Sequence, residues 1–285
     1  MTGSDSSLLI AGAQFIGLAL LVVGVTRYLL LAGIEEGGRA WGVPAKIEGQ
    51  ILGYATSVPE LVGTVATAAR GLLGAGLWNV AASNIINWLL FGAAVLYYRR
   101  GSAVFRRVYL GEIGFAATAV AVPLVLSRQG AWSRTPMVAL ALLGFFLLYQ
   151  VADRVISARL ADVGEAADEA SAPAPDQQGA SGLRAVIFML LGLVGIVVIG
   201  HFLGGVAERI VVALDVPQFA VGWILGLVTS LPEMTTFFAV FAAAKGEPTA
   251  QGAAQRSLDN LAASNMSNVG LVYPIGILIF VYVAG

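Results

Sequence analysis

Long runs of apolar residues alternate along the chain with short polar connections, and this pattern predicts a bundle of membrane-spanning helices. A helix needs about 20 predominantly apolar residues to cross a bilayer. The chain offers eight segments of that length, so we expect an all-α membrane protein with about eight transmembrane helices. The segments cover approximately residues 8–32, 43–69, 72–98, 108–127, 136–156, 184–204, 217–244 and 253–283.

Two of these apolar segments are interrupted by the same polar sequence. Residues 53–61 read Gly-Tyr-Ala-Thr-Ser-Val-Pro-Glu-Leu, and residues 226–234 read Gly-Leu-Val-Thr-Ser-Leu-Pro-Glu-Met, at a constant offset of 173. A second motif, Asn-x-Ala-Ala-Ser-Asn-x-x-Asn, occupies residues 79–87 and 260–268, at an offset of 181. The second copy therefore has eight extra residues between its two motifs. The chain is an internal duplication.

The interruptions bring oxygen atoms into apolar surroundings. Pro59 lacks an N–H and clashes with the carbonyl four residues earlier, so it releases that oxygen from the helical ladder, and Pro232 does the same in the second copy. A carboxylate inside a membrane normally faces a partner or a cavity, because its burial in hydrocarbon costs several kcal/mol. Each copy thus offers a carboxylate (Glu60, Glu233), two hydroxyls and loose carbonyls. These are the ligands of a hard cation, although the two acids could instead fix helix packing.

Composition supports the membrane assignment and excludes several classes of protein. The chain has 285 residues, of which 58% are hydrophobic and 12% charged, with a mean hydropathy of +0.83. The net charge of −1 and the lack of a basic tract argue against nucleic acid as a partner. The sequence contains no cysteine and one histidine, which argues against a soft-metal site. We see no activated nucleophile or cofactor loop, so we expect neither an enzyme nor a bound cofactor.

The distribution of basic residues predicts the orientation in the membrane. If the loop with Arg99, Arg100, Arg106 and Arg107 is cytoplasmic, that side carries eleven Lys and Arg residues and the other side four. We therefore expect the N-terminus outside the cell and residues 160–183 inside. The first apolar segment is too long for the core of a signal peptide, so we expect it to be retained.

The same topology predicts that the two copies are inverted relative to each other. Five spans separate the start of copy one from the start of copy two, and an odd number turns the second copy upside down. We divide the chain into a first repeat (1–159), an acidic linker rich in Ala, Pro, Gly and Ser (160–183), and a second repeat (184–285). The linker has the composition of a disordered tether. Inverted repeats with broken helices at the midplane are the architecture of alternating-access transporters.

The duplicated motifs, Gly-x-x-Thr-Ser-φ-Pro-Glu followed by Ala-Ser-Asn-x-x-Asn, resemble the α-repeats of the calcium:cation antiporter superfamily, closest to the sodium/calcium exchanger branch. The resemblance implies Ca²⁺ export in exchange for Na⁺ across the cell membrane, with both ions as substrates. It implies that Glu60 and Glu233 hold Ca²⁺ and that Thr56 and Thr229 add carbonyl oxygens. Further residues would line flanking Na⁺ sites or close the middle of the site: Ser57, Ser230, Ser83, Ser264, Gly53, Gly226, Asn87 and Asn268.

Two departures from the family pattern leave alternatives open. Sodium/calcium exchangers commonly have Asp at the position of Asn268, so coupling to H⁺ and transport of another divalent cation stay possible. The family usually has ten spans, so a second protomer or a partner subunit could complete the second half, or the chain could be a binding subunit that does not transport. Asp259, five residues before Ser264, is an additional candidate carboxylate.

Overall fold

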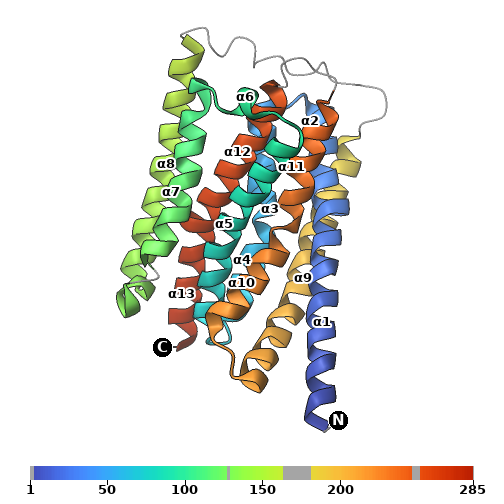
Figure 1. Cartoon of the computed structure of the whole chain (residues 1–285), viewed down its shortest axis with the longest axis vertical. Helices are drawn as coiled ribbons and strands as arrows, with labels where there is room; N and C mark the ends of the chain where they lie inside the picture. Colours follow the sequence, from blue (N-terminus) through green and yellow to red (C-terminus); the bar gives the residue numbers. More distant parts are fainter. Residues whose placement is uncertain (1–2, 127–128, 163–180, 246–250, 285) are drawn as a thin grey trace.

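The computed structural model describes residues 3–126, 129–162, 181–245 and 251–284 and shows an all-helical bundle (Figure 1). No strand occurs in these ranges. The first half contains α1 (Gly3–Val25), η1 (Thr26–Leu31), α2 (Ala32–Trp41), α3 (Ala45–Thr56), α4 (Val58–Ala68), α5 (Leu73–Tyr97), α6 (Gly101–Val104), η2 (Arg107–Tyr109), α7 (Leu110–Leu126), η3 (Gly130–Arg134) and α8 (Pro136–Asp162). The second half contains α9 (Gly182–Leu214), α10 (Gln218–Thr229), α11 (Leu231–Ala243), α12 (Gln251–Ser267), η4 (Asn268–Val272) and α13 (Tyr273–Ala284).

Seven stretches of the described chain are long and apolar enough to cross a membrane, and they confirm the expected fold class of a multi-pass helical protein. The eighth expected span, residues 43–69, is present as α3 and α4 but is not among the seven. This pair is broken at Ser57 and carries Lys46, Glu48 and Glu60, which lower its hydropathy. The count of seven therefore differs from the expected eight because this broken crossing carries three charged residues.

Several helix ends differ from the expected spans. The first helical stretch continues from Leu9 to Trp41 rather than ending near residue 32. Likewise α8 extends to Asp162 and α9 begins at Gly182, so both helices reach into the expected linker. The disorder expected of the linker falls on residues 163–180, which lie outside the described part. We call the end of the bundle at which α8 ends and α9 begins the linker face; it is at the top of Figure 1.

The two broken helices run in opposite directions through the centre of the bundle (Figure 1). The chain passes from α3 to α4 away from the linker face and from α10 to α11 toward it. Each broken helix packs closely on the motif helix of the other half: α3 on α12, and α10 on α5. The halves are therefore inverted and interlocked, as the odd number of intervening spans predicted.

Glycine at two equivalent positions allows these close packings. A Cβ atom on Gly53 would lie 2.6 Å from the carbonyl oxygen of Asn260, and one on Gly226 would lie 2.8 Å from the Cβ of Ala82. Real side chains do not approach this closely, so the backbones can meet only because both residues lack a side chain. This contact brings α3 against α12 and α10 against α5 at the level of the two polar motifs.

Peripheral helices flank this core on two opposite sides. The pair α7 and α8 packs on α12 and α13, whereas α1 and α9 pack on each other and on the other side of the core (Figure 1). The outward faces of these helices are apolar and exposed, as at Leu147 (65% exposed) and Leu190 (57%). Such extensive exposed apolar surface is typical of helices that face lipid rather than water.

Candidate cation-binding site

The two polar motifs break their helices in the same way. Helix α3 ends and α4 begins around Ser57 (φ −80°, ψ −4°), and α10 ends and α11 begins around Ser230 (φ −82°, ψ 0°). In each copy the proline follows as the second residue of the new helix, where its missing N–H would be unpaired in any case. Glu60 and Glu233 consequently lie in the first turn of α4 and α11.

Both carboxyl groups are fully buried at the centre of the bundle. Glu60 and Glu233 are each 0% exposed. Glu60 lies beside Thr229 and Glu233 beside Thr56, and the two acids are close enough to repel each other. Ser264 Oγ donates to Glu233 Oε1 at 3.1 Å, but Glu233 Oε2 and both oxygens of Glu60 have no hydrogen-bond partner. Buried carboxylates without partners are costly, and a bound cation removes that cost.

Two asparagines complete the centre of the site in a symmetric manner. Asn87 Nδ2 donates to Ser264 Oγ at 3.3 Å, and Asn268 Nδ2 donates to Ser83 Oγ at 3.2 Å. In both residues the amide nitrogen is used for this contact with the opposite half, while Oδ1 is buried without a partner. Each asparagine thus offers one carbonyl oxygen to the centre of the bundle.

A second pair of asparagines joins the helices rather than offering oxygen atoms. Asn84 Nδ2 donates to the carbonyl of Asn265 at 3.3 Å, and Asn265 Nδ2 donates to the carbonyl of Asn84 at 3.2 Å. Asn84 Nδ2 also donates to the carbonyl of Ala119 on α7. These reciprocal bonds fix α5 against α12, so the pair positions the site.

The serines at the two helix breaks differ from each other. Ser57 Oγ lies 3.1 Å from Ser264 Oγ and accepts a hydrogen bond from Ser267 Oγ at 2.9 Å. Ser230 Oγ is buried and has no partner. The residue equivalent to Ser267 in the first copy is Ile86, which cannot donate. The expected symmetry of the flanking serines therefore does not extend to their hydrogen bonds.

The threonines and glycines lie where the motif places them. Thr56 Oγ1 donates to the carbonyl of Gly53 at 3.1 Å, and Thr229 Oγ1 approaches that of Gly226 at 3.5 Å. Both carbonyls are thus already in contact with hydroxyl groups of their own helix. Of the twelve site residues expected from the sequence, Ser57 and Ser230 form the two breaks, and the other ten lie on α3, α4, α5, α10, α11, α12 and η4.

Asn79 is a site residue that sequence reasoning did not single out. Its Nδ2 donates to the carbonyl of Glu60 at 3.3 Å, and its Oδ1 accepts from Thr229 Oγ1 at 3.2 Å. It therefore links the two helix breaks. The available signal was its place as first residue of the repeated Asn-x-Ala-Ala-Ser-Asn motif; the equivalent Asn260 is also fully buried.

Among the twelve site residues expected from the sequence, every buried side-chain atom without a partner is an oxygen, whereas in the neighbouring Asn260 both Oδ1 and Nδ2 lack partners. Oxygen is the ligand atom that Na⁺ and Ca²⁺ require as hard cations. The described residues contain no group of three or more His, Cys, Asp or Glu side chains arranged to hold a metal, so the site consists of two carboxylates and neutral oxygens. The six unpartnered oxygens are Glu60 Oε1 and Oε2, Glu233 Oε2, Asn87 Oδ1, Asn268 Oδ1 and Ser230 Oγ.

Comparison with known proteins identifies the family. The sequence model of the family described as "Sodium/calcium exchanger protein" matches residues 11–152 and 184–284, which is most of the chain. The chain belongs to this family. A comparison with curated proteins finds no match.

Solved structures of the sodium-calcium exchanger NCX_Mj show the same fold. The structure soaked with 2.5 mM Na⁺ and 10 mM Sr²⁺ has a TM-score of 0.55 and 19% identity, over 97% of this chain and 87% of that one. The structure soaked with 2.5 mM Na⁺ and 0.1 mM Ca²⁺ has a TM-score of 0.56 and 20% identity, over 96% and 86% of the two chains. This member of the exchanger family is thus a multi-pass cation antiporter.

A cavity of about 510 Å³ lies on the linker-face side of the candidate cation site. Its lining comes from η1, α2, α3, α11 and α12 and includes Leu52, the residue before Gly53. The cavity is also lined by Ala239 of α11. The equivalent residue of the first half, Ala66, is only 7% exposed, and a Cβ on Gly204 of α9 would lie 2.5 Å from it. Helix α9 therefore covers α4, whereas the matching side of α11 borders an open cavity.

Proposed function

We propose that this exchanger-family protein moves Ca²⁺ out of the cell in exchange for Na⁺ by alternating access. The observation that carries the proposal is the set of six buried oxygens without partners, contributed by both inverted halves. Two carboxylates among them balance the charge of one Ca²⁺ or of two Na⁺ ions. An empty site would leave two uncompensated charges in a low-dielectric interior, which disfavours movement of the helices without an ion.

The residues have distinct roles in this proposal. Glu60 and Glu233 bind Ca²⁺ directly, and the carbonyls of Thr56 and Thr229 add neutral ligands. Asn87 and Asn268 close the middle of the site through Oδ1. Na⁺ binds beside them, at positions lined by Ser57, Ser230, Ser83 and Ser264 and the carbonyls of Gly53 and Gly226.

Alternating access follows from the unequal covering of the two halves. In the structure the cavity lies toward the linker face, while α9 packs over the equivalent surface of α4. We place the linker face in the cytoplasm of a cell-membrane protein, with the N-terminus outside, on the distribution of Lys and Arg. The cavity is then the cytoplasmic access route, and movement of α1 and α9 relative to the core exchanges the open side.

Ca²⁺ uptake into proteoliposomes with an imposed Na⁺ gradient tests this proposal. We expect uptake when Na⁺ is inside and Ca²⁺ outside, and loss of uptake when both sides contain equal Na⁺. Uptake that ignores the Na⁺ gradient contradicts Na⁺ coupling. Ca²⁺ binding without any flux, or flux only with a second protein present, would instead identify a binding subunit.

A second candidate coupling is supported by the two asparagines. Because Asn87 and Asn268 are both amides that make equivalent hydrogen bonds, the site contains no third carboxylate between the two glutamates. H⁺ carried on Glu60 and Glu233 would then drive Ca²⁺ or another divalent cation. The same proteoliposomes with a pH gradient and no Na⁺ distinguish the two couplings.

A further inference from the structure

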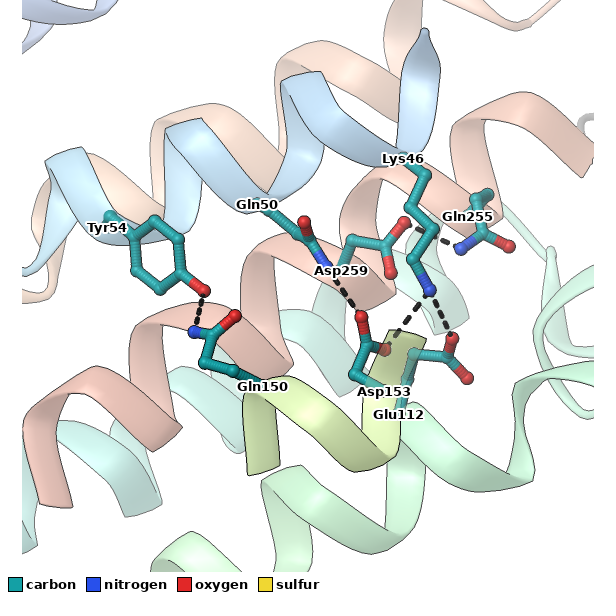
Figure 2. Close-up of polar contacts among 8 residues, drawn as sticks. All are labelled: Lys46, Gln50, Tyr54, Glu112, Gln150, Asp153, Gln255 and Asp259. Atoms are coloured by element: carbon teal, nitrogen blue, oxygen red, sulfur yellow. Dashed lines mark hydrogen bonds and ion pairs between the residues drawn. The ribbon is translucent and has the colours of Figure 1, made fainter. Parts of the chain in front are cut away.

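A group of charged side chains lies away from the cation site, between the core and the peripheral pair α7 and α8 (Figure 2). We call Lys46, Glu112, Asp153 and Asp259 the acidic seam. Lys46 comes from α3, Glu112 from α7, Asp153 from α8 and Asp259 from α12. The proposed transport function uses none of these residues, and Asp259, a candidate site carboxylate from the sequence, belongs to this seam.

The contacts of the seam concentrate several acids around one ammonium group. Lys46 Nζ lies 3.1 Å from Asp153 Oδ1 and 3.5 Å from Glu112 Oε1, and it also attracts Asp259. Two amides supply neutral hydrogen bonds: Gln50 Nε2 donates to Asp153 Oδ2 at 2.8 Å, and Gln255 Nε2 donates to Asp259 Oδ2 at 2.6 Å (Figure 2).

The seam holds more acidic groups than one lysine can neutralise. Glu112 and Asp153 are each 6% exposed and Asp259 is 2% exposed. Even with Asp153 left out of the count, ionisation of Glu112 and Asp259 beside one Lys⁺ would leave an excess of one negative charge in a buried position. Glu112 Oε2 is in addition buried without a hydrogen-bond partner. A further positive charge is therefore needed in this region.

Among the described residues, the other ionisable groups around the seam do not supply that charge. Arg256, on the same helix as Asp259, pairs with Glu48 of α3 at 3.5 Å. Arg154 of α8 is exposed. Tyr54 and Tyr149 are neutral side chains that face the same acids from α3 and α8. Along α12, Glu233 of α11 contacts Ser264 rather than the seam, and it adds no positive charge.

The equivalent helix contact shows that helix packing alone does not require these charges. Lys46 and Asp259 lie on α3 and α12, and the equivalent residues on α10 and α5 are Phe219 and Trp78. These two rings pack edge to face with centroids 6.3 Å apart. The contact between a broken helix and a motif helix is thus ionisable at α3 and α12 and apolar at α10 and α5.

We propose that the acidic seam is a proton-binding site and that Asp259 carries the proton. Asp259 is the most buried of the three acids, its hydrogen bond comes from a neutral amide, and it shares the attraction of Lys46 with Asp153 and Glu112. A proton is the ligand that we propose, because one proton on Asp259 removes a buried negative charge without requiring further oxygen ligands. The proposal goes beyond exchange at the cation site and does not depend on it.

Infrared spectroscopy and thermal unfolding of the purified full chain test the proposal. Both are measured in a Glu60→Gln, Glu233→Gln background, so that the acids of the cation site do not titrate. We expect a protonated-carboxyl band at neutral pH that shifts when aspartate is labelled with ¹³C in the side chain and disappears in Asp259→Asn. If Asp259→Asn does not fold, the shift of the band in the ¹³C-labelled chain still assigns it to an aspartate.

The unfolding temperature supplies an independent readout. A proton held in the folded chain but released on unfolding makes stability fall as pH rises. Asp259→Asn, which stays neutral, should flatten this dependence by the equivalent of one proton. Asp215→Asn, at an exposed helix end, is the matched control and should leave the slope unchanged.

Two results would overturn the proposal. One is a band that lacks the aspartate shift, or that persists in Asp259→Asn. The other is stabilisation by Na⁺ or Ca²⁺ at constant ionic strength in the background chain that is lost with Asp259→Asn, because the positive charge of the seam would then be a metal cation.

Discussion

Asn87 and Asn268 make the same contact from opposite halves of the bundle. The amide nitrogen of each donates to the serine of the other half, at 3.3 Å and 3.2 Å, and each Oδ1 is left without a partner. The two asparagines therefore make two-fold-related hydrogen bonds. Because each amide nitrogen is held by a serine, each Oδ1 is the atom of the side chain that remains available as a ligand.

This relationship predicts the effect of a charge at one of the two positions. Asn268→Asp replaces a neutral oxygen by a carboxylate beside two buried glutamates, so the empty site would carry three negative charges instead of two. We expect more Na⁺ ions to be exchanged for each Ca²⁺, measured from the reversal potential of flux in proteoliposomes. An unchanged reversal potential with normal flux would place this position outside the Na⁺ sites.

Neutralising either buried acid should abolish exchange. Removing one charged partner of a buried ion costs about 3–5 kcal/mol, which corresponds to about a 10²- to 5 × 10³-fold loss of affinity. We expect this loss of Ca²⁺ affinity for Glu60→Gln and for Glu233→Gln, measured by calorimetry and by flux. Asp215→Asn, at an exposed helix end, is the control and should transport normally. Normal transport by either Gln variant of the site would refute the assignment.

The two serines at the helix breaks should differ in their effects. Ser57→Ala removes contacts with Ser264 and Ser267, and each lost hydrogen bond costs about 1 kcal/mol, so we expect a lower unfolding temperature. Ser230→Ala removes a hydroxyl that has no protein partner, so it should weaken Na⁺ binding with little change in stability. Thermal unfolding with and without Na⁺ measures both effects. Equal behaviour of the two variants would contradict the asymmetry.

Adding a methyl group at the close helix contacts should separate the helices. Gly53→Ala and Gly226→Ala would place a Cβ within 2.6–2.8 Å of the neighbouring helix, and overpacking of this kind costs about 1–3 kcal/mol. We expect reduced stability and loss of flux in both. Gly92→Ala on α5, where a Cβ would meet nothing within 4 Å, is the control. Normal flux in the first two variants would show that the contact is not required.

The open cavity can be tested by thiol labelling, because the chain contains no cysteine. Ala239→Cys lines the cavity and should react with a membrane-impermeant reagent added on the linker face. Ala66→Cys, the equivalent position covered by α9, should be protected in the same state. If a change in the Na⁺ or Ca²⁺ concentration makes Ala66→Cys reactive and protects Ala239→Cys, the site opens alternately to the two sides of the membrane. Equal protection under all conditions would count against alternating access.

The sequence predicted the parts of the molecule that the duplication repeats. The residues 53–61 and 226–234 each break a helix at the serine, and the inversion of the halves follows from counting spans. Gly53 and Gly226 occupy the same position in the two copies, and the resemblance to the family implied that both line Na⁺ sites. The structure shows that both glycines also permit close contact between helices. Their ligand role stays a prediction.

The features that the sequence did not predict are those in which the copies differ. Ile86 in place of Ser267 removes one donor at Ser230, and the other contacts of Ser57, with Gly53 and Ser264, also have no counterpart at Ser230. The charged seam was also missed, because Lys46, Glu112, Asp153 and Asp259 come from four separate helices and form no motif. The first helix was expected to end near residue 32, but Glu36 in its continuation accepts a bond from the backbone of Ser181 and pairs with Arg184 at 3.4 Å, which anchors it to α9.

The edge-to-face pair of Trp78 and Phe219 has a consequence for the direction of transport. A perfectly two-fold carrier would respond identically to acidification on either side of its membrane. Here the ionisable lysine and aspartate lie at the contact between α3 and α12, whereas two aromatic rings lie at the equivalent contact between α5 and α10. In the proposed exchange the gradients alone still determine the equilibrium, but we expect forward and reverse turnover to differ in their sensitivity to acid, which would make the carrier a kinetic rectifier.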